Sequence, residues 1–273
     1  MLLLARSPRF QDHDPGPYHP ERPERLAAID TAVDGALAAG VAADTLELRP
    51  ATREELARAH GEPHLERLSA LRGQAAQLDA DTATSAASVD VAELAAGATI
   101  DMMQSVLSGR HHAGLALVRP PGHHAIPERA MGFCLLGNVA IAVKNLLDTG
   151  AAERVAIYDW DVHHGNGTQD MFYDDPRVLF MSTHQWPFYP GTGAVEETGA
   201  GEAEGSTMNL PLPAGSGDED LLTLTRDVLA PRVRAFAPDL IVVSAGYDGH
   251  VADPLGGFSV TTDGYRELSL RWR

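Results

Sequence analysis

Short apolar runs alternate along the chain with longer segments in which apolar residues recur at helical spacing. The short runs, bounded by glycine, proline or charged residues, predict strands at residues 2–5, 114–118, 154–157, 178–182 and 240–244, with a brief strand at 46–48. Helical spacing predicts helices at residues 26–39, 53–60, 64–77, 91–107, 138–147 and 218–235. Polar or proline- and glycine-rich composition predicts loops at residues 11–25, 78–88 and 199–205.

This alternation predicts an α/β fold. We expect a single domain, residues 1–273, with a mostly parallel sheet flanked by helices on both faces. The chain is 44% apolar, enough to bury one large core. Sites in such sheets lie beyond the carboxyl ends of the strands. Polar residues that directly follow the predicted strands are therefore the candidates for chemistry.

The composition is acidic, with 38 Asp and Glu against 21 Lys and Arg and a net charge of −17. This balance argues against nucleic acid as a direct partner. No apolar run has the length of a signal peptide or a membrane span, so no membrane association is expected. Cys134 is the only cysteine, which rules out an intramolecular disulfide and favours a reducing, cytoplasmic location.

The densest group of chemically active residues follows the predicted strand at 154–157. Side chains alternate along a strand, so Asp159, Asp161 and His163 are expected on one face. Buried carboxylates and imidazoles are costly unless they are paired or bind a metal. An Asp-x-His pair supplies an oxygen and a nitrogen ligand suited to zinc. The alternative interpretation is a helix-capping turn with solvated acids.

Two other strand ends supply complementary groups. The prolines of an Arg-Pro-Pro-Gly segment end one predicted strand and stiffen the loop that carries His123 and His124. Neighbouring histidines are often surface decoration, but this rigid lead-in favours a catalytic role. Asp248 follows the last predicted strand. The candidate catalytic and metal-binding side chains are therefore expected to gather at the carboxyl ends of three strands.

Together these residue types predict a metal-assisted amide hydrolase. Asp161, His163 and Asp248 would form a three-ligand zinc site with an open position, where zinc polarises a carbonyl and lowers the pKa of water towards roughly 7. The two histidines would move protons, one from water and one to the leaving amine. Asp159 and Asn166 are the candidates that orient them. A nucleophilic serine has little support, because no Gly-x-Ser-x-Gly segment is present.

Five stretches of the chain resemble the motifs of the histone deacetylase family. They are residues 119–124 (RPPGHH), 159–168 (DWDVHHGNGT), 244–248 (SAGYD), 253–257 (DPLGG) and 19–23 (HPERP). The similarity covers nearly the whole chain, and it is nearest to the class II branch with its bacterial relatives, which Asn166 fits. It implies the arginase–deacetylase fold and a zinc-dependent deacetylase that removes acetyl groups from lysine-type amines.

The resemblance also implies individual roles for the histidine pair and its partners. His123 would be the electrostatic member, paired with Asp159. His124 would be the general base and acid, near Asn166. A structural monovalent cation, potassium, would bind around the central strand at a site that includes Asp159, Asp161, His163 and Ser182.

The same resemblance implies where the substrate binds. Phe133 and Tyr189 match the aromatic pair that lines the acyl-lysine tunnel, with Gly132 beside Phe133. Leu255 would sit at the rim. Polyamine-selective relatives can carry an acidic residue at that rim position, so Leu255 favours acyl-lysine substrates. Ordinary core packing is the alternative interpretation for the two aromatic residues.

The chain departs from the family pattern at its end. Family members continue past the helix expected near Thr262 into another strand and a Gly-Gly-Tyr loop, whose tyrosine donates to the oxyanion. This sequence ends at Arg273 without that segment. Loss of one oxyanion donor lowers the rate by about 10²–10³. An uncovered sheet edge also invites association, so a homo-oligomer is expected as one outcome.

Three hypotheses follow. The first is a zinc deacylase, weakened or restricted to activated acyl groups. The second is a catalytically weak, deacetylase-like protein that binds acyl-lysine or an acylated amine. The third is an arginase-like dinuclear manganese hydrolase, which two manganese ions per chain would reveal. The sequence leaves open whether the substrate is an acetylated protein or peptide, a polyamine or a small metabolite.

Overall fold

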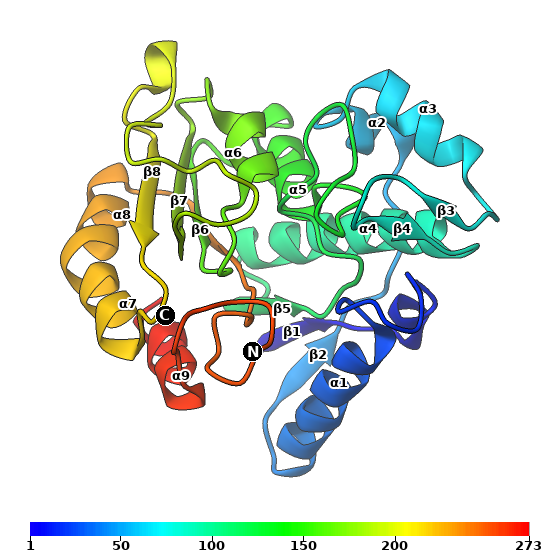
Figure 1. Cartoon of the computed structure of the whole chain (residues 1–273), viewed down its shortest axis with the longest axis horizontal. Coiled ribbons are helices and arrows are strands. Elements are labelled where there is room, and N and C mark those ends of the chain that lie inside the picture. The colour runs from blue at the N-terminus through cyan, green and yellow to red at the C-terminus, as the bar shows by residue number, and fades with distance from the viewer. Residues whose placement is uncertain (273) are drawn as a thin grey trace. The chain divides into compact units, whose positions relative to one another are not determined.

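The computed structural model, shown in Figure 1, describes residues 1–272. Contacts within the chain divide it into two compact units, Met1–Ala151 and Ala152–Arg273. Each unit contains its own parallel sheet and its own helices. Parallel strands flanked by helices confirm the predicted α/β class.

The first unit is built on a three-stranded parallel sheet in the order β2-β1-β5. Its strands are β1 (Leu2–Ala5), β2 (Ala43–Thr45) and β5 (Ala113–Ala116), with Leu2 opposite both Ala43 and Ala113. A short antiparallel hairpin consists of β3 (Ala76–Gln77) and β4 (Ala83–Thr84). The helix predicted at 64–77 is therefore wrong in its last part, because the helix ends at residue 70 and residues 76–77 pair as β3. The second strand lies within the predicted polar loop at 78–88.

The helices of the first unit follow local sequence signals. They are the 3₁₀ helix η1 (Pro8–Gln11), α1 (Pro23–Ala38), α2 (Arg53–Ala57), α3 (Glu62–Ala70), α4 (Ser88–Leu107) and α5 (Asn138–Asp148). Thr52 and Glu55 form a capping box that starts α2, and α1 starts with a proline in its first turn. Figure 1 shows α4 running alongside α5, and its other contacts include β1 and β5.

Two strands of this unit differ from the prediction. The brief strand expected at residues 46–48 is wrong: β2 precedes it, and Leu46 and Leu48 instead pack their side chains against the core after the strand ends. The strand expected at 114–118 is shifted, and its residues are half-exposed rather than buried, because β5 lies at the edge of its sheet. An apolar run therefore sets neither the bounds of a strand nor the burial of its residues.

The second unit is built on a four-stranded parallel sheet in the order β8-β7-β6-β9. Its strands are β6 (Val155–Asp159), β7 (Val178–Gln185), β8 (Thr207–Leu212) and β9 (Leu240–Ser244). All of β6 and β7 is buried, as expected for the central strands of a parallel sheet. Val155 lies opposite Val178 on one side and Leu240 on the other.

The helices of the second unit are α6 (Asn166–Phe172), η2 (Gly201–Ala203), α7 (Asp218–Leu224), the π-helical turn η3 (Thr225–Leu229), α8 (Ala230–Phe236) and α9 (Thr262–Arg271). The predicted helix at 218–235 is therefore one run with a π-helical turn inside it. Leu221, Leu229 and Val233 of this run pack against Tyr158 and Met181 of the sheet, so it covers one face (Figure 1).

The strand β8 has no counterpart in the prediction. Its sequence, Thr-Met-Asn-Leu-Pro-Leu, contains an asparagine and a proline, and both residue types are depleted in strands. Pro211 is tolerated because β8 is the edge of the sheet, where one side needs no hydrogen-bond donors. Within residues 1–272, no helix combines the length and apolar character needed to cross a bilayer.

Candidate metal centre and associated site residues

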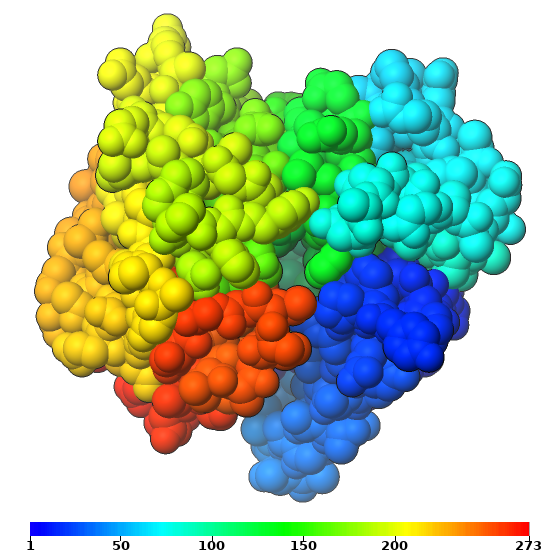
Figure 2. Space-filling model, viewed as in Figure 1, coloured from blue at the N-terminus to red at the C-terminus, as the bar shows by residue number. Residues whose placement is uncertain are grey.

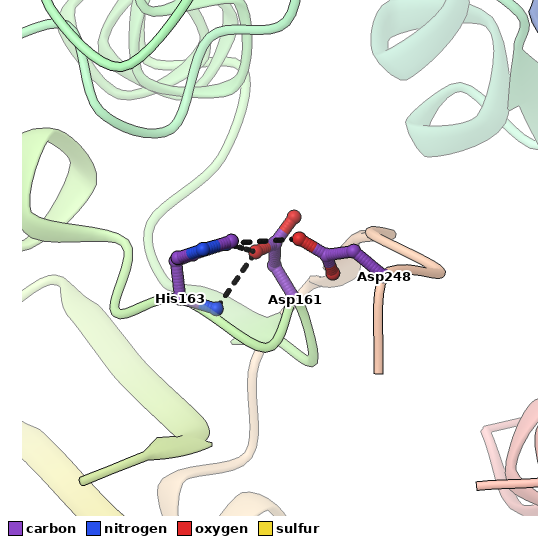
Figure 3. Close-up of side chains that lie close together, drawn as sticks. All are labelled: Asp161, His163 and Asp248. Atoms are coloured by element: carbon purple, nitrogen blue, oxygen red, sulfur yellow. Dashed lines mark hydrogen bonds and ion pairs between the residues drawn. The ribbon is translucent and has the colours of Figure 1, made fainter. Parts of the chain in front are cut away.

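Two loops of the second unit bring Asp161, His163 and Asp248 together (Figure 3). Asp161 and His163 follow β6, and Asp248 follows β9. These strands pair in parallel, with Asp159 opposite Ser244, so both loops leave the same edge of the sheet. The sequence predicted this placement, because residues that directly follow parallel strands meet beyond the carboxyl ends of those strands.

The three side chains converge on a small volume. His163 Nδ1 lies 3.0 Å from Asp161 Oδ1 and 2.9 Å from Asp248 Oδ2. One ligand atom from each residue lies within 4.8 Å of the other two. The backbone holds the carboxylates in place, because His163 N–H donates to Asp161 Oδ1 (2.8 Å) and Val162 N–H donates to Asp248 Oδ1 (3.0 Å).

The charges of this group favour a bound cation. Burial lowers the pKa of His163, but hydrogen bonds and charges from Asp161 and Asp248 outweigh burial and raise that pKa to about 10. Burial and the Asp161 charge raise the pKa of Asp248, although His163 opposes them. The imidazole therefore holds a proton between two carboxylates. A divalent metal can replace that proton, and two oxygens with one nitrogen fit zinc.

Gly246 lets the two loops approach each other. A Cβ atom at this position would collide with the Asp161 carboxylate. The glycine of the Ser-Ala-Gly-Tyr-Asp stretch is therefore required by close contact with a candidate metal ligand, and its backbone has no positive φ to explain it.

Asp159, the last residue of β6, lies beside Ser182, in the middle of β7. They are partners in the strand register, and both side chains are fully buried. Asp159 Oδ1 accepts a hydrogen bond from Asp161 N–H (3.1 Å), and Ser182 Oγ lies 2.9 Å from His184 Nδ1. Two buried oxygen-bearing side chains beside a metal-ligand loop are suitable ligands for a hard cation.

Asn166 begins α6 and is almost fully buried, and its N–H donates to His164 O (2.8 Å). The expected pairings of Asp159 with His123 and of Asn166 with His124 join residues of different units. These two pairings stay predictions.

The histidine pair lies in the first unit, after β5. The ring centroids of His123 and His124 are 3.9 Å apart, and His124 is 4% exposed. The lead-in is held on two sides: Asn138 Nδ2 donates to Pro120 O (3.0 Å), and a Cβ at Gly122 would lie 2.6 Å from Asn138 N. The rigidity predicted from the two prolines is thus reinforced by packing against the start of α5.

Gly132 and Phe133 form the tip of a tight turn in the same unit, and both have positive φ angles, 56° and 68°. The backbone of Gly132 lies against the ring of His124, where a Cβ would collide. Phe133 N–H donates to Thr82 Oγ1 (3.1 Å), and the His19 ring packs edge-on against Phe133 at 4.6 Å. Phe133 is therefore a positioned side chain beside the histidine pair.

Tyr189 is 38% exposed, and its ring lies 6.0 Å from that of His163 in the second unit. Phe188, which the sequence analysis did not assign, stacks on His163 at 5.1 Å with an interplanar angle of 17°. Its apolar, half-buried character gave no signal beyond the aromatic composition of the loop. Leu255 lies in the surface segment between β9 and α9, orange to red in Figure 2, and is 36% exposed.

A largely buried polar network behind the Tyr189 loop has no local signal in the sequence. Glu197 accepts the backbone N–H groups of Gly193 and Ala194 and the side-chain amide of Gln169. His164 Nε2 lies 2.9 Å from Gln169 Oε1, which also accepts from the Asn209 amide. These residues are scattered over 46 positions of sequence, so no local pattern connects them.

A second unpredicted pairing supports the histidine lead-in. Arg119 binds Glu21 in a bidentate ion pair, Nε to Oε1 at 2.5 Å and Nη2 to Oε2 at 2.7 Å, and Arg119 Nη1 also donates to Phe10 O. Both side chains are at least 95% buried. Glu21 lies in the motif at residues 19–23 and Arg119 in the motif at residues 119–124. The sequence of neither motif predicts that the two are in contact.

Comparisons with known proteins agree with these features. The chain matches the family model described as histone deacetylase domain over residues 19–271. It is 44% identical over 263 residues to a "Probable deacetylase" of Archaeoglobus fulgidus, covering 96% of this chain and 73% of that protein. It is 37% identical over 260 residues to a "Histone deacetylase-like amidohydrolase" of Pseudomonas aeruginosa, covering 93% and 67%.

Longer relatives and a solved structure show the same similarity. Against "Histone deacetylase 10, chloroplastic" of Oryza sativa the identity is 40%, and the chain spans 93% of its own length but only 61% of the rice protein. A crystal structure of the HDA15 HD domain superposes with a TM-score of 0.94 at 37% identity, covering 99% of this chain and 79% of that one.

Proposed function

The chain belongs to the histone deacetylase family, and from this premise we propose that it is a zinc-dependent deacylase that acts on acyl-lysine or a related acylated amine. The convergence of Asp161, His163 and Asp248 carries the proposal, because it supplies two oxygens and one nitrogen within 4.8 Å. Three protein ligands with an open position are typical of catalytic zinc. When bound there, zinc supplies Lewis acidity that polarises an amide carbonyl.

The proposed reaction is hydrolysis of an amide. The oxygen of water forms a bond to the carbonyl carbon and the carbon–nitrogen bond breaks. The products are a carboxylic acid and an amine, and transfer of the acid's proton to the amine leaves a carboxylate and an ammonium group. The proton that water loses goes to His124, which then gives a proton to the leaving nitrogen. His123, 3.9 Å from His124, supplies the electrostatic partner.

The orienting roles are assigned to two acceptors. Asp159 would hold His123, and Asn166 would hold His124, each through the second ring nitrogen. Both Asp159 and Asn166 are buried and fixed at the end of β6 and the start of α6. This burial supports a role that requires a defined side-chain position.

The proposed acyl-binding residues are Gly132, Phe133, Tyr189 and Leu255. Tyr189 supports this role because it is partly exposed beside a metal ligand. Gly132 and Phe133 support it because the turn lies directly against His124. The apolar Leu255 favours an acyl-lysine peptide or protein over a polyamine. The net charge of −17 is compatible with a cationic substrate and with a cytoplasmic protein.

Potassium is proposed as a second, structural cation at Asp159, Asp161, His163 and Ser182. The two fully buried members, Asp159 and Ser182, are its main support. A buried carboxylate is less costly when a cation compensates its charge. Removal of potassium is expected to lower thermal stability without removing zinc.

The decisive test is hydrolysis of acetyl-lysine and trifluoroacetyl-lysine peptides by the zinc-loaded protein. Asp248→Ala should abolish turnover of both and lower zinc content. Asp239→Ala is the matched control, because the Asp239 carboxylate accepts from the backbone N–H groups of Glu153 and Arg154, which precede β6 and lie at the opposite end of that strand from Asp161. The control should keep both activity and zinc.

The possible outcomes separate the hypotheses. Turnover of the trifluoroacetyl substrate alone indicates a zinc site that works without an oxyanion-donating tyrosine, because that carbonyl is already electrophilic. Turnover of both indicates that another group supplies the donor. Stoichiometric zinc with no turnover overturns the enzyme proposal and leaves an acyl-lysine-binding protein. Two manganese ions per chain would instead support the arginase-like alternative.

A further inference from the structure

Two buried histidines of the first unit, His60 and His64, belong neither to the metal centre nor to the histidine pair. His60 lies between α2 and α3, and His64 lies on α3. Each is 2% exposed, and their ring centroids are 4.9 Å apart. Buried polar atoms need hydrogen-bond partners. The partners of both rings lie in a single segment, residues 126–137, which we call the Phe133 loop.

The ring of His60 joins the two ends of the Phe133 loop. Gly137 N–H donates to His60 Nε2 (2.9 Å), so this nitrogen is an acceptor and carries no hydrogen. The hydrogen of the neutral ring is therefore on Nδ1, which donates to Ile126 O (3.2 Å). One side chain thus satisfies a carbonyl at the start of the loop and an amide at its end.

Neighbouring groups hold the same loop. His64 Nε2 lies 3.0 Å from Leu135 O, so the ring donates to that carbonyl. Gly61 N–H donates to Pro127 O (2.9 Å), and the Arg67 guanidinium donates to Glu128 O. The junction of α2 and α3 therefore anchors both arms of the loop, and the tip is left to other contacts.

The tip needs this support because its backbone is strained. Phe133 has a φ of 68°, which is unfavourable for a residue with a Cβ, and Gly132 beside it has a φ of 56°. Such conformations persist only where the surroundings determine them. Thr82 Oγ1 and the His19 ring hold the tip from one side. The anchored arms hold it from the other.

We propose that His60 is a positioning residue that keeps the Phe133 loop in its substrate-binding conformation. The proposal rests on the proposed function, in which Phe133 contacts the acyl chain. Loss of one buried hydrogen bond of ordinary strength shifts a local equilibrium about five- to tenfold. The competent fraction falls by up to that factor, and the apparent KM rises in proportion to the loss of that fraction. The bound complex is unchanged, so kcat stays within about twofold.

Three substitutions of His60 separate its two bonds. His60→Gln places an amide oxygen where Nε2 was and keeps an acceptor for Gly137 N–H. His60→Asn places an amide nitrogen where Nδ1 was and keeps only the donor to Ile126 O. His60→Ala removes both. Asn and Gln keep a polar side chain at the site, so the test stands even if His60→Ala does not fold.

Hydrogen exchange of the Gly137 amide gives a readout that does not depend on turnover. We expect exchange to accelerate about tenfold in His60→Ala and His60→Asn and to stay near the wild-type rate in His60→Gln. Equal protection of Gly137 in all three variants would overturn the proposal. Because exchange is measured on any folded protein, this result stands even if the protein proves not to hydrolyse acyl-lysine.

Steady-state kinetics on the acetyl-lysine peptide give the second readout. KM should rise most in His60→Ala, which loses both bonds, and less in His60→Gln, which loses only the bond to Ile126 O, with kcat nearly constant in both. His111→Ala is the matched control, because His111 is a histidine of the same unit that binds Ser105 and Asp44 instead of the Phe133 loop. An equal rise of KM in the control, or a fall in kcat alone, would contradict a positioning role.

Discussion

At the candidate metal centre, backbone amides hold the candidate ligand carboxylates in place. Asp159, Asp161 and Asp248 each accept one N–H group from the loop that follows β6. These bonds fix the carboxylates before any metal binds, because the donors belong to a short loop that starts at a fully buried strand. The ligand geometry is therefore expected to tolerate little displacement.

Gly246→Ala tests that tolerance. The new methyl group would collide with the Asp161 carboxylate and displace one ligand. We expect zinc affinity to fall by about 10- to 100-fold, the range seen when groups that orient metal ligands are removed. Competition with a chromophoric chelator measures this.

Gly35→Ala is the control for Gly246→Ala. Gly35 lies within α1, and a Cβ there would meet no atom within 4 Å. This substitution should leave zinc affinity unchanged and raise the free energy of unfolding by up to about 1 kcal/mol, because alanine is the better helix former. Wild-type zinc affinity in Gly246→Ala would show that the loops can separate without loss of the site.

At the scale of elements, buried polar contacts attach loops to the scaffold. The Glu21–Arg119 ion pair joins the loop before α1 to the segment between β5 and the histidine pair. Its charges are almost fully desolvated, and Arg119 has a further backbone acceptor in Phe10 O. Removing one member of such a pair leaves an uncompensated buried charge.

Glu21→Ala is therefore expected to lower the free energy of unfolding by about 3–5 kcal/mol. Urea denaturation followed by circular dichroism measures the change. Arg22→Ala, at the next position, is the control: its ion pair with Glu24 is long (4.0 Å) and solvent-exposed, so the cost should be within about 0.5 kcal/mol. Equal effects of the two substitutions would mean that the buried pair contributes no more than an exposed one.

At the scale of the whole molecule, buried neutral histidines make the fold sensitive to acid. Burial is the largest cause that lowers the pKa of His13 to about 4, of His60 to about 3 and of His184 to about 4. In the unfolded chain each titrates near 6.5. Below pH 6.5 the unfolded chain therefore binds more protons than the folded one, so the free energy of unfolding falls as the pH drops.

Between pH 6.5 and 5, without added metal, we expect a loss of about 1 kcal/mol per pH unit for each of these histidines. Urea denaturation at several pH values gives the slope of unfolding free energy against pH. His13→Asn should reduce this slope by about 1 kcal/mol per pH unit. The raised pKa of His163 acts in a different pH range. Its contribution to the free energy of unfolding is complete below pH 6.5 and is lost as the pH rises towards 10. A slope of zero would contradict the burial argument.

Self-association also belongs to this scale and stays a prediction. Ile241 of β9 is 40% exposed, and among the described strands β9 pairs only with β6. Exposed apolar edge strands favour association, whereas the charge of −17 opposes it. Light scattering over a range of protein concentrations measures which effect dominates.

The sequence by itself determined the α/β class, most of the helices and the candidate metal ligands. These features are encoded locally. The alternation that puts Asp159, Asp161 and His163 on one face needs only consecutive residues, and so does the stiff lead-in to His123. Motifs of five to ten residues carried the family resemblance for the same reason.

Only the tertiary structure decided which distant residues meet. Glu21 binds Arg119 across 98 positions and His60 binds Gly137 across 77, and no local pattern records such pairings. The same holds for β8, whose pairing with β7 outweighs an unfavourable composition. Contacts of this kind depend on how close two backbones come, as Gly246 shows beside Asp161. That distance is set by the packing of whole elements rather than by any short stretch of sequence.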